Sequence, residues 1–250
     1  MQLPLTTKGL LLILFFLFAT QIPFSISAGS LSLHSIKSSY EGKKLSGVYS
    51  LYEILCLEEA GLSRDAFEMA ANRYEEWRQK GIRFRDELLT IIDFSKPSSS
   101  QRLFVLNIPA AKIVFKTWVA HGKNSGLLYA RHFSNKAQTY QSSLGFFKTL
   151  QPYQGENGYS LRLEGLDKNI NDNAFERAIV MHGAPYVSAA NLQRNGYLGR
   201  SWGCPAVPVA QSKEIIETIK NGSLLFIYHP VLDSFFKKET TRRKPELQNL

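Results

Sequence analysis

Three apolar stretches in the middle of the chain decide the fold: LLTIIDF at residues 88–94, RLFVL at 102–106 and KIVFKTWV at 112–119. They are rich in β-branched and aromatic residues, and each is too short for a typical helix. Segments bearing proline, serine or asparagine at 96–100 and 107–111 separate them, as turns separate strands. The pattern predicts three strands, of which the last two form an antiparallel hairpin.

Four further short segments have the same character, and a helical pattern precedes the last of them. The predicted strands lie at 145–149, 159–163, 177–181 and 223–228, and the predicted helix lies at 209–220. Seven short strands separated by turn signals are typical of a β-sandwich or barrel rather than of a parallel sheet. We therefore expect a mostly β domain over residues 88–232.

A small helical pair is predicted ahead of the strands, in an N-terminal helical region at residues 48–87. Apolar residues recur there at steps of three and four, which is the period of an amphipathic helix. Gly61-Leu62-Ser63 divides the pattern into two helices. Ser63 is a suitable N-cap for the second helix, and Gly81 is a suitable end.

Residues 1–28 have the composition of a cleaved signal peptide. Lys8 precedes an apolar run at 9–19 that is too short to span a bilayer, and small residues follow near Ser27. An uncleaved membrane anchor is the alternative. Cleavage predicts an exported protein, periplasmic or cell-wall associated, without stable membrane insertion.

Composition and charge limit the partners that we expect. The chain of 250 residues is 44% hydrophobic and 20% charged, which is ordinary for a globular protein and unlike disordered or collagenous chains. Its formal net charge of +9 favours anionic partners, such as cell-wall polymers. Basic residues cluster only in the C-terminal tail at 233–250, so no nucleic-acid partner is expected. A linker bearing serine and glycine is predicted at 29–47.

The chain has two cysteines, Cys56 and Cys204. In an oxidising compartment an even count is consistent with one disulfide. Cys56 lies in the apolar stripe of the first predicted helix, where a free cysteine packs as a small hydrophobic residue. The sequence therefore leaves two alternatives, a disulfide between Cys56 and Cys204 or two free thiols.

Residues suited to chemistry gather between 177 and 208. A predicted strand ends at His182-Gly183, which holds the ring at the mouth of a rigid element. Cys204 follows Gly203 in a tight turn, where N–H groups can point at one oxygen atom and form an oxyanion site. An adjacent imidazole, its tautomer fixed by a carbonyl or a carboxylate, can take the thiol proton and return it to a leaving amine. The spacing equally fits a buried histidine and a disulfide-bonded cysteine.

Two runs carry these residues: RAIVMHGAPYVS at 177–188 and GRSWGCPAV at 199–207. Together with upstream segments they resemble the murein L,D-transpeptidase catalytic-domain family, and more closely its branch with a Gly-Arg-Ser-x-Gly-Cys-Pro-Ala signature. The resemblance spans about residues 48–230. Its upstream segments lie at 93–98, 119–126, 133–135, 142–147 and 158–166.

The resemblance implies an L,D-transpeptidase-like β-sandwich or barrel catalytic domain at 88–232, preceded by the helical pair. It implies acyl transfer on peptidoglycan stem peptides through a thioester on Cys204, with His182 as the base and no cofactor. By the same resemblance, Gly183 belongs to the loop of His182, and Ser201 and Gly203 shape the turn of Cys204. The N–H groups of Gly203 and Cys204 are then the expected oxyanion donors. An L,D-carboxypeptidase or a cross-link hydrolase would use the same thioester, and a non-catalytic cell-wall-binding module is the third alternative.

The chain departs from the broader family two residues after the nucleophile, where Ala206 replaces an arginine. Arg200, in the same turn, is a candidate to replace that cation. His121 ends another predicted strand and is a candidate substrate contact, as are Tyr186 and Trp202, which flank the predicted site. A metal site would need three or four converging ligands, and we expect none.

Overall fold

The computed structural model describes residues 47–235, and these contain one eight-stranded sheet. The predicted signal peptide at 1–28, the linker up to residue 46 and the tail beyond residue 235 lie outside the described residues. None of the helices within 47–235 is long and apolar enough to cross a bilayer.

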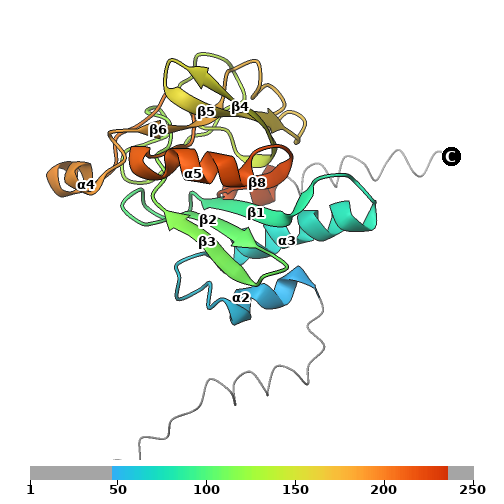
Figure 1. Ribbon diagram of the computed structural model, residues 1–250. Coiled ribbons are helices and arrows are strands. Elements are labelled where there is room, and N and C mark those ends of the chain that lie inside the picture. Colours follow the sequence, from blue (N-terminus) through green and yellow to red (C-terminus); the bar gives the residue numbers. More distant parts are fainter. Residues whose placement is uncertain (1–46, 236–250) are drawn as a thin grey trace, which may run out of the picture. The chain divides into compact units, whose positions relative to one another are not determined.

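The sheet is mixed, and its order in space differs from its order along the chain. The strands are β1 (Arg85–Asp93), β2 (Leu103–Asn107), β3 (Lys112–Thr117), β4 (Gly145–Gly155), β5 (Gly158–Gly165), β6 (Val180–Ala184), β7 (Ala206–Pro208) and β8 (Ser223–Tyr228) (Figure 1). They are arranged as β3-β2-β1-β8-β4-β5-β6-β7. Neighbours are antiparallel except for the parallel pairs β1–β8 and β6–β7. The expected mostly β class is confirmed, as is the β2–β3 hairpin.

The two edges of the sheet are joined beyond the end of β3. Ala120 donates its N–H to the Ala206 oxygen at 2.8 Å, and the reverse bond measures 3.4 Å. Farther along, the Ser201 N–H donates to the His121 oxygen at 3.0 Å, and the Lys123 N–H donates to the Ser201 oxygen at 2.8 Å. The sheet is therefore nearly closed into a barrel, and the chain after β3 lies beside the turn that carries Cys204.

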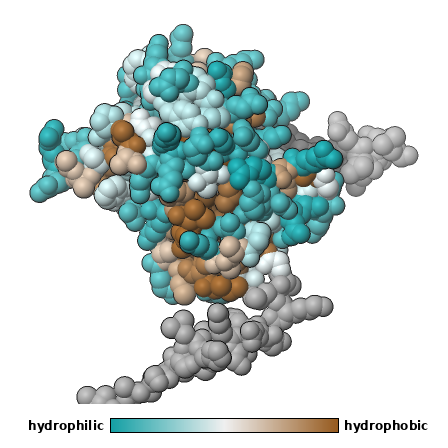
Figure 2. Space-filling view, viewed as in Figure 1, coloured by the Kyte–Doolittle hydropathy of each residue, from teal (hydrophilic) through white to brown (hydrophobic). Residues whose placement is uncertain are grey.

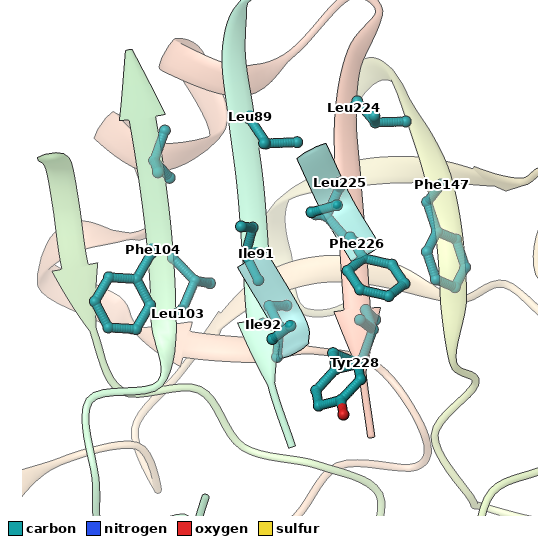
Figure 3. Packing of buried hydrophobic residues seen from close by; sticks show 14 of the residues in the cluster. Leu89, Ile91, Ile92, Leu103, Phe104, Phe147, Leu224, Leu225, Phe226 and Tyr228 are labelled. Atoms are coloured by element: carbon teal, nitrogen blue, oxygen red, sulfur yellow. The ribbon is translucent and has the colours of Figure 1, made fainter. Parts of the chain in front are cut away.

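The hydrophobic core lies on the central strands. Every residue of β8 and the last six residues of β1 are buried, so both faces of these strands are covered. Figure 3 shows side chains from β2, β1, β8 and β4, among them Phe104, Ile91, Phe226 and Phe147, packed side by side. The rings of Phe146 and Phe226 stack with their centroids 4.1 Å apart. This core gives the sheet a rigid centre from which the site strands extend.

Helix α3 (Arg64–Gln79) packs on β1 and β8. Strong helix formers fill it, and its buried residues lie at helical spacing: Ala66, Phe67, Ala70, Ala71 and Tyr74. The predicted break at Gly61-Leu62-Ser63 is confirmed, and Gly81, with φ of 64°, follows the helix end. Ser63 occupies the N-cap position, but its hydroxyl makes no capping hydrogen bond.

The first predicted helix is much shorter than its periodicity suggested. It consists of the 3-10 turn η1 (Val48–Ser50) and α2 (Leu51–Ile54), followed by further turns. Cys56 lies after the helix end, exposed and with a positive φ of 47°, so the prediction that it packs in the core is wrong. Both Cys56 and Cys204 are free thiols, and the disulfide alternative is not what the structure shows.

The C-terminal third contains both confirmed and unpredicted elements. Helix α5 (Val209–Ile219) confirms the predicted helix, and its buried Ile215, Ile216 and Ile219 face the sheet. Strand β6 begins three residues later than predicted, and β7 was not predicted at all. Helix α4 (Ala189–Asn195) was also missed; it has no buried residue and lies apart from the sheet in Figure 1.

Most of the face shown in Figure 2 is hydrophilic, with hydrophobic residues gathered over β3 and α2. In β3, Ile113, Val114 and Phe115 are only half-buried, and Ile54 of α2 is exposed. Because β3 is the first strand of the sheet order, its side chains have fewer neighbours than those of the central strands.

Candidate active site

His182 lies on β6 with only 4% of its surface exposed. Its Nδ1 is 3.0 Å from the backbone oxygen of Gly183. Because a carbonyl oxygen can only accept, Nδ1 carries the hydrogen and Nε2 keeps its lone pair. Burial lowers the pKa of His182, and the bond to Gly183 opposes that shift in part. The ring is therefore neutral near pH 7, with Nε2 able to accept a proton.

Gly183 allows helix α5 to approach β6 closely. A Cβ atom at this position would lie 2.6 Å from Ser212 Oγ and 3.3 Å from the Val209 Cα. Any side chain would push against the start of α5 and displace the carbonyl that orients His182. Glycine here therefore supports the histidine through packing.

The turn that carries Cys204 is built around the Ser201 hydroxyl. Ser201 Oγ donates to the Cys204 backbone oxygen at 2.6 Å and accepts the Gly203 N–H at 3.1 Å. The Gly203 amide is thus engaged, which corrects the expectation that it is free for an oxyanion. The Cys204 N–H donates to no acceptor within residues 47–235, so it is a free amide beside the thiol.

Gly203 is required by its backbone conformation and by its surroundings. Its φ is 126°, and a Cβ atom there would lie 2.8 Å from the Gln141 oxygen. We expect Gly203→Ala to lower the free energy of unfolding by about 3 kcal/mol, since strain and a backbone contact add up. The matched control is Gly196→Ala, whose φ is 76° but whose Cβ meets nothing within 4 Å; it should cost about 1 kcal/mol. Urea unfolding of both variants measures this, and equal costs would contradict the account.

The Cys204 thiol contacts the backbone at the start of β6. Its Sγ accepts the Val180 N–H at 3.5 Å and lies 3.7 Å from the Ala178 oxygen, to which the S–H donates. Burial raises the pKa of Cys204, while the Val180 N–H and the positive charge of Arg177 lower it. Because burial has the largest effect, the group is a neutral thiol near pH 7 rather than a preformed thiolate.

Arg177 lies near this thiol, although the sequence pattern did not single it out. Its half-buried guanidinium donates to the backbone oxygens of Ser134 at 2.6 Å and Gln141 at 2.9 Å, and also to the Ser143 hydroxyl. Burial lowers the pKa of Arg177, and the charge of Cys204 opposes that shift. Arg177 thus ties the segment before β4 to the segment just before β6 and brings a positive charge toward the thiol.

The influence of Arg177 on Cys204 can be measured by the pH dependence of thiol alkylation. A positive charge favours the thiolate, so removing it in Arg177→Gln should move the midpoint of iodoacetamide labelling to higher pH. Arg200→Gln is the matched control, because the Cys204 pKa is not shifted by Arg200. Cys56→Ser serves as the background so that only Cys204 is labelled. Identical midpoints in the two arginine variants would contradict the assignment.

The pairing of β6 with β7 brings the backbones of His182 and Cys204 together. His182 pairs with Ala206 in parallel register, and its N–H donates to the Pro205 oxygen at 3.4 Å. Within residues 47–235 no hydrogen bond joins the thiol to the ring, since Sγ bonds the β6 backbone instead. His182 lines a cleft of about 410 Å³, together with Tyr159, Tyr186 and Ser212. The two residues therefore lie on neighbouring segments without a direct hydrogen bond.

His121 is buried rather than placed in the cleft. Its ring is 1% exposed, its Nδ1 lies 2.8 Å from Arg102 Nη2, and its Nε2 lies 3.3 Å from the Gly126 oxygen. Burial and the charge of Arg102 lower the pKa of His121 to about 3. The expected substrate contact at His121 therefore finds no support. Its backbone oxygen instead accepts the Ser201 N–H and so holds the turn.

Arg200 is half-buried and points to the chain after β3. Its Nη1 donates to the backbone oxygens of Lys123 at 3.3 Å and Gly126 at 3.4 Å. Its charge acts on His121 rather than on Cys204. The candidate replacement for the family arginine is thus not placed beside the thiol, and Arg177 is the cation that acts there.

The two aromatic candidates lie in different surroundings. Tyr186 is half-buried in the cleft with His182, and burial, aided by the charge of Cys204, raises the pKa of Tyr186 to about 12. Trp202 stands in the turn that carries Cys204, with 72% of its surface exposed. Only Tyr186 therefore shares a cavity with the histidine, while Trp202 faces solvent.

The site combines a free thiol, a neutral imidazole with an oriented lone pair, and an amide beside the thiol without an acceptor. In the part of the chain that the structure describes, no three His, Cys, Asp or Glu side chains come together as metal ligands would. Fold and site together define a mostly β protein with a cysteine–histidine site at the closure of its sheet.

Comparison with known proteins identifies the family to which this chain belongs. The family model for the L,D-transpeptidase catalytic domain matches residues 58–228, and the chain belongs to that family. No curated protein matches the chain.

Solved structures similar to the chain include an L,D-transpeptidase from Mycobacterium smegmatis, which is 13% identical, with 57% of this chain and 59% of that chain covered and a TM-score of 0.35. Another is an L,D-transpeptidase from Stackebrandtia nassauensis, at 13% identity, 73% and 76% coverage and a TM-score of 0.35. A third is a helical cell shape determining protein from Campylobacter jejuni, at 10% identity, 62% and 54% coverage and a TM-score of 0.40. The chain spans less than two thirds of the first and third of these proteins.

Proposed function

We propose that the protein is a cysteine acyltransferase that acts on peptidoglycan stem peptides, with Cys204 as nucleophile and His182 as base. The observation that carries the proposal is the pairing of β6 with β7, which sets a histidine of fixed tautomer beside a turn that presents a free thiol. Membership of the L,D-transpeptidase catalytic-domain family supports the substrate class. The signal-peptide pattern at 1–28 supports action outside the cytoplasm, in the periplasm or at the cell wall.

The reaction begins with proton transfer from the Cys204 thiol to His182 Nε2. Because the resting thiol bonds the β6 backbone, one of the two side chains must turn before this transfer; contacts of this kind commonly tighten only when substrate binds. The sulfur attacks the carbonyl that joins an L-centre to a D-amino acid, and the Cys204 N–H stabilises the oxyanion. The imidazolium then gives its proton to the leaving amine, and a thioester remains on Cys204.

The thioester is resolved by an amine of a second stem peptide, which returns the free thiol and forms a cross-link. His182 takes the proton of the incoming amine, so the same base serves both half-reactions. Water in place of the amine gives hydrolysis. Tyr186 and His182 both line the same cleft, and we assign the incoming amine to it for that reason.

The proposal is tested by incubating the protein with purified muropeptides and analysing the products by mass. A covalent dimer is the expected result. A shortened monomer would mean that the same site catalyses hydrolysis instead of transfer. Unchanged muropeptides that still bind the protein would reject catalysis and leave a cell-wall-binding module.

A further inference from the structure

An exposed aromatic group stands directly on the nucleophile turn. Trp202 is 72% exposed, which makes it the most exposed of the large hydrophobic side chains within residues 47–235. Tyr140 lies against it with ring centroids 5.7 Å apart and an angle of 55° between the rings. An exposed tryptophan in a turn without a covering element loses the free energy that its burial would give, so its position needs another explanation.

A cation completes this group. Lys123 Nζ lies 4.4 Å from the centroid of the Tyr140 ring and 6.0 Å from that of Trp202. Attraction between an ammonium group and the negative face of an aromatic ring orders all three side chains. We call Trp202, Tyr140 and Lys123 the aromatic platform.

The platform is fixed to the nucleophile turn by close backbone packing. A Cβ atom on Gly122 would lie 3.0 Å from the Gly203 Cα and in contact with the Tyr140 oxygen. Tyr140 itself has a positive φ of 54°, a conformation that costs a non-glycine residue about 1–2 kcal/mol. The fold therefore holds the strained backbone of Tyr140 close to the nucleophile turn, with its ring beside that of Trp202.

We propose that the aromatic platform binds the sugar ring of a peptidoglycan glycan strand next to the reacting stem peptide. This inference rests on the proposed function, because it names a further part of the same substrate. The C–H face of a pyranose is weakly positive and apolar, and it complements the negative face of an indole ring. Lys123 supplies N–H donors for the hydroxyl and N-acetyl oxygens at the edge of the sugar.

The stem peptide fits this platform less well than the glycan. The sugar ring is the part of peptidoglycan that offers a flat C–H face of about the size of an indole, whereas amino acids beside the scissile carbonyl present small or charged groups. The side of the turn that bears Trp202 is also distinct from the cleft beside His182, whose lining does not include Trp202. The platform therefore extends the binding surface beyond the cleft.

The test measures tryptophan fluorescence of the Cys204→Ala protein during titration with a chitin tetrasaccharide, which contains sugar without peptide. A saturable change is expected, and Trp202→Ala should raise the dissociation constant about tenfold, since one stacked ring is lost. Isothermal titration calorimetry measures the dissociation constant of the Trp202→Ala variant, which lacks the fluorescent residue. Tyr49→Ala, which removes an exposed tyrosine from η1, should leave the dissociation constant unchanged. No binding, or equal weakening by both variants, would overturn the proposal.

A second readout separates this inference from the proposed function. Turnover of a sugar-bearing muropeptide should fall in Trp202→Ala through a higher KM, and by a clearly larger factor than turnover of the free stem peptide. Equal losses on both substrates would assign the platform to the peptide and overturn the inference. A protein that binds the tetrasaccharide through Trp202 but forms no acyl-enzyme would reject the proposed function and leave this inference standing.

Discussion

Replacing Cys204 by serine is expected to lower the rate of dimer formation from muropeptides by at least about a thousandfold. A hydroxyl ionises far less readily than a thiol, and His182 would have to remove its proton without the help of a soft, polarisable sulfur. We expect the rest of the turn to stay intact in this variant, because Ser201 holds it through the Cys204 backbone oxygen rather than through the side chain. The loss should therefore appear in kcat.

Cys56→Ser is the matched control for this variant. Cys56 is a free, exposed cysteine in a turn after α2, so its loss removes one thiol without touching β6 or β7. We expect full activity in Cys56→Ser and the loss of at least about a thousandfold in Cys204→Ser. A Cys204→Ser protein that still forms dimers at a rate near that of the wild type would show that Cys204 is not the nucleophile.

Replacing His182 by glutamine is the second change with a large expected effect, a loss of about 10² to 10⁴ in kcat near pH 7. Glutamine keeps a polar side chain on β6 but cannot take the thiol proton. Because Cys204 is a neutral thiol at this pH, the reaction needs the base. As the pH rises toward the thiol pKa, the variant should regain part of its rate, since hydroxide then supplies the thiolate.

The wild-type pH profile adds a directional test of the same residue. Burial lowers the pKa of His182, so the ring stays neutral to a lower pH than an ordinary histidine, and the acid limb of kcat/KM should lie below about pH 6.5. His132→Gln, at an exposed histidine, should leave both the rate and the profile unchanged. A large loss in His132→Gln, or an acid limb well above pH 6.5, would contradict the assignment of the base.

Local patterns predicted the elements that short stretches of sequence determine. The β2–β3 hairpin, helix α3 and helix α5 follow from alternation, periodicity and turn residues, and the structure confirms all three. Strand β7 escaped prediction because it has only three residues and forms through its contact with β6. The parallel pairs also depend on segments far apart in the chain, which local periodicity does not reveal.

The candidate site was also predicted only in part, because some of its residues lie in local motifs and others depend on contacts between distant segments. Cys204 and His182 could be named as candidates because each lies next to a glycine in a recognisable motif. The contribution of Arg177 depends on Ser134 and Gln141, which only folding brings to it, so its position at the start of a predicted strand carried no signal. His121 resembles His182 in sequence, since both precede a glycine, but His121 is buried and its ring contacts Arg102.

The most direct test of the central claim is the intact mass of the protein after brief mixing with a donor stem peptide. A thioester should add the mass of the peptide minus its leaving D-amino acid, and fragmentation should place that mass on the peptide that contains Cys204. The adduct should be absent from Cys204→Ala and should disappear when an acceptor amine is added. A protein that turns over muropeptides without ever carrying this mass, or that carries it on another residue, would contradict the account.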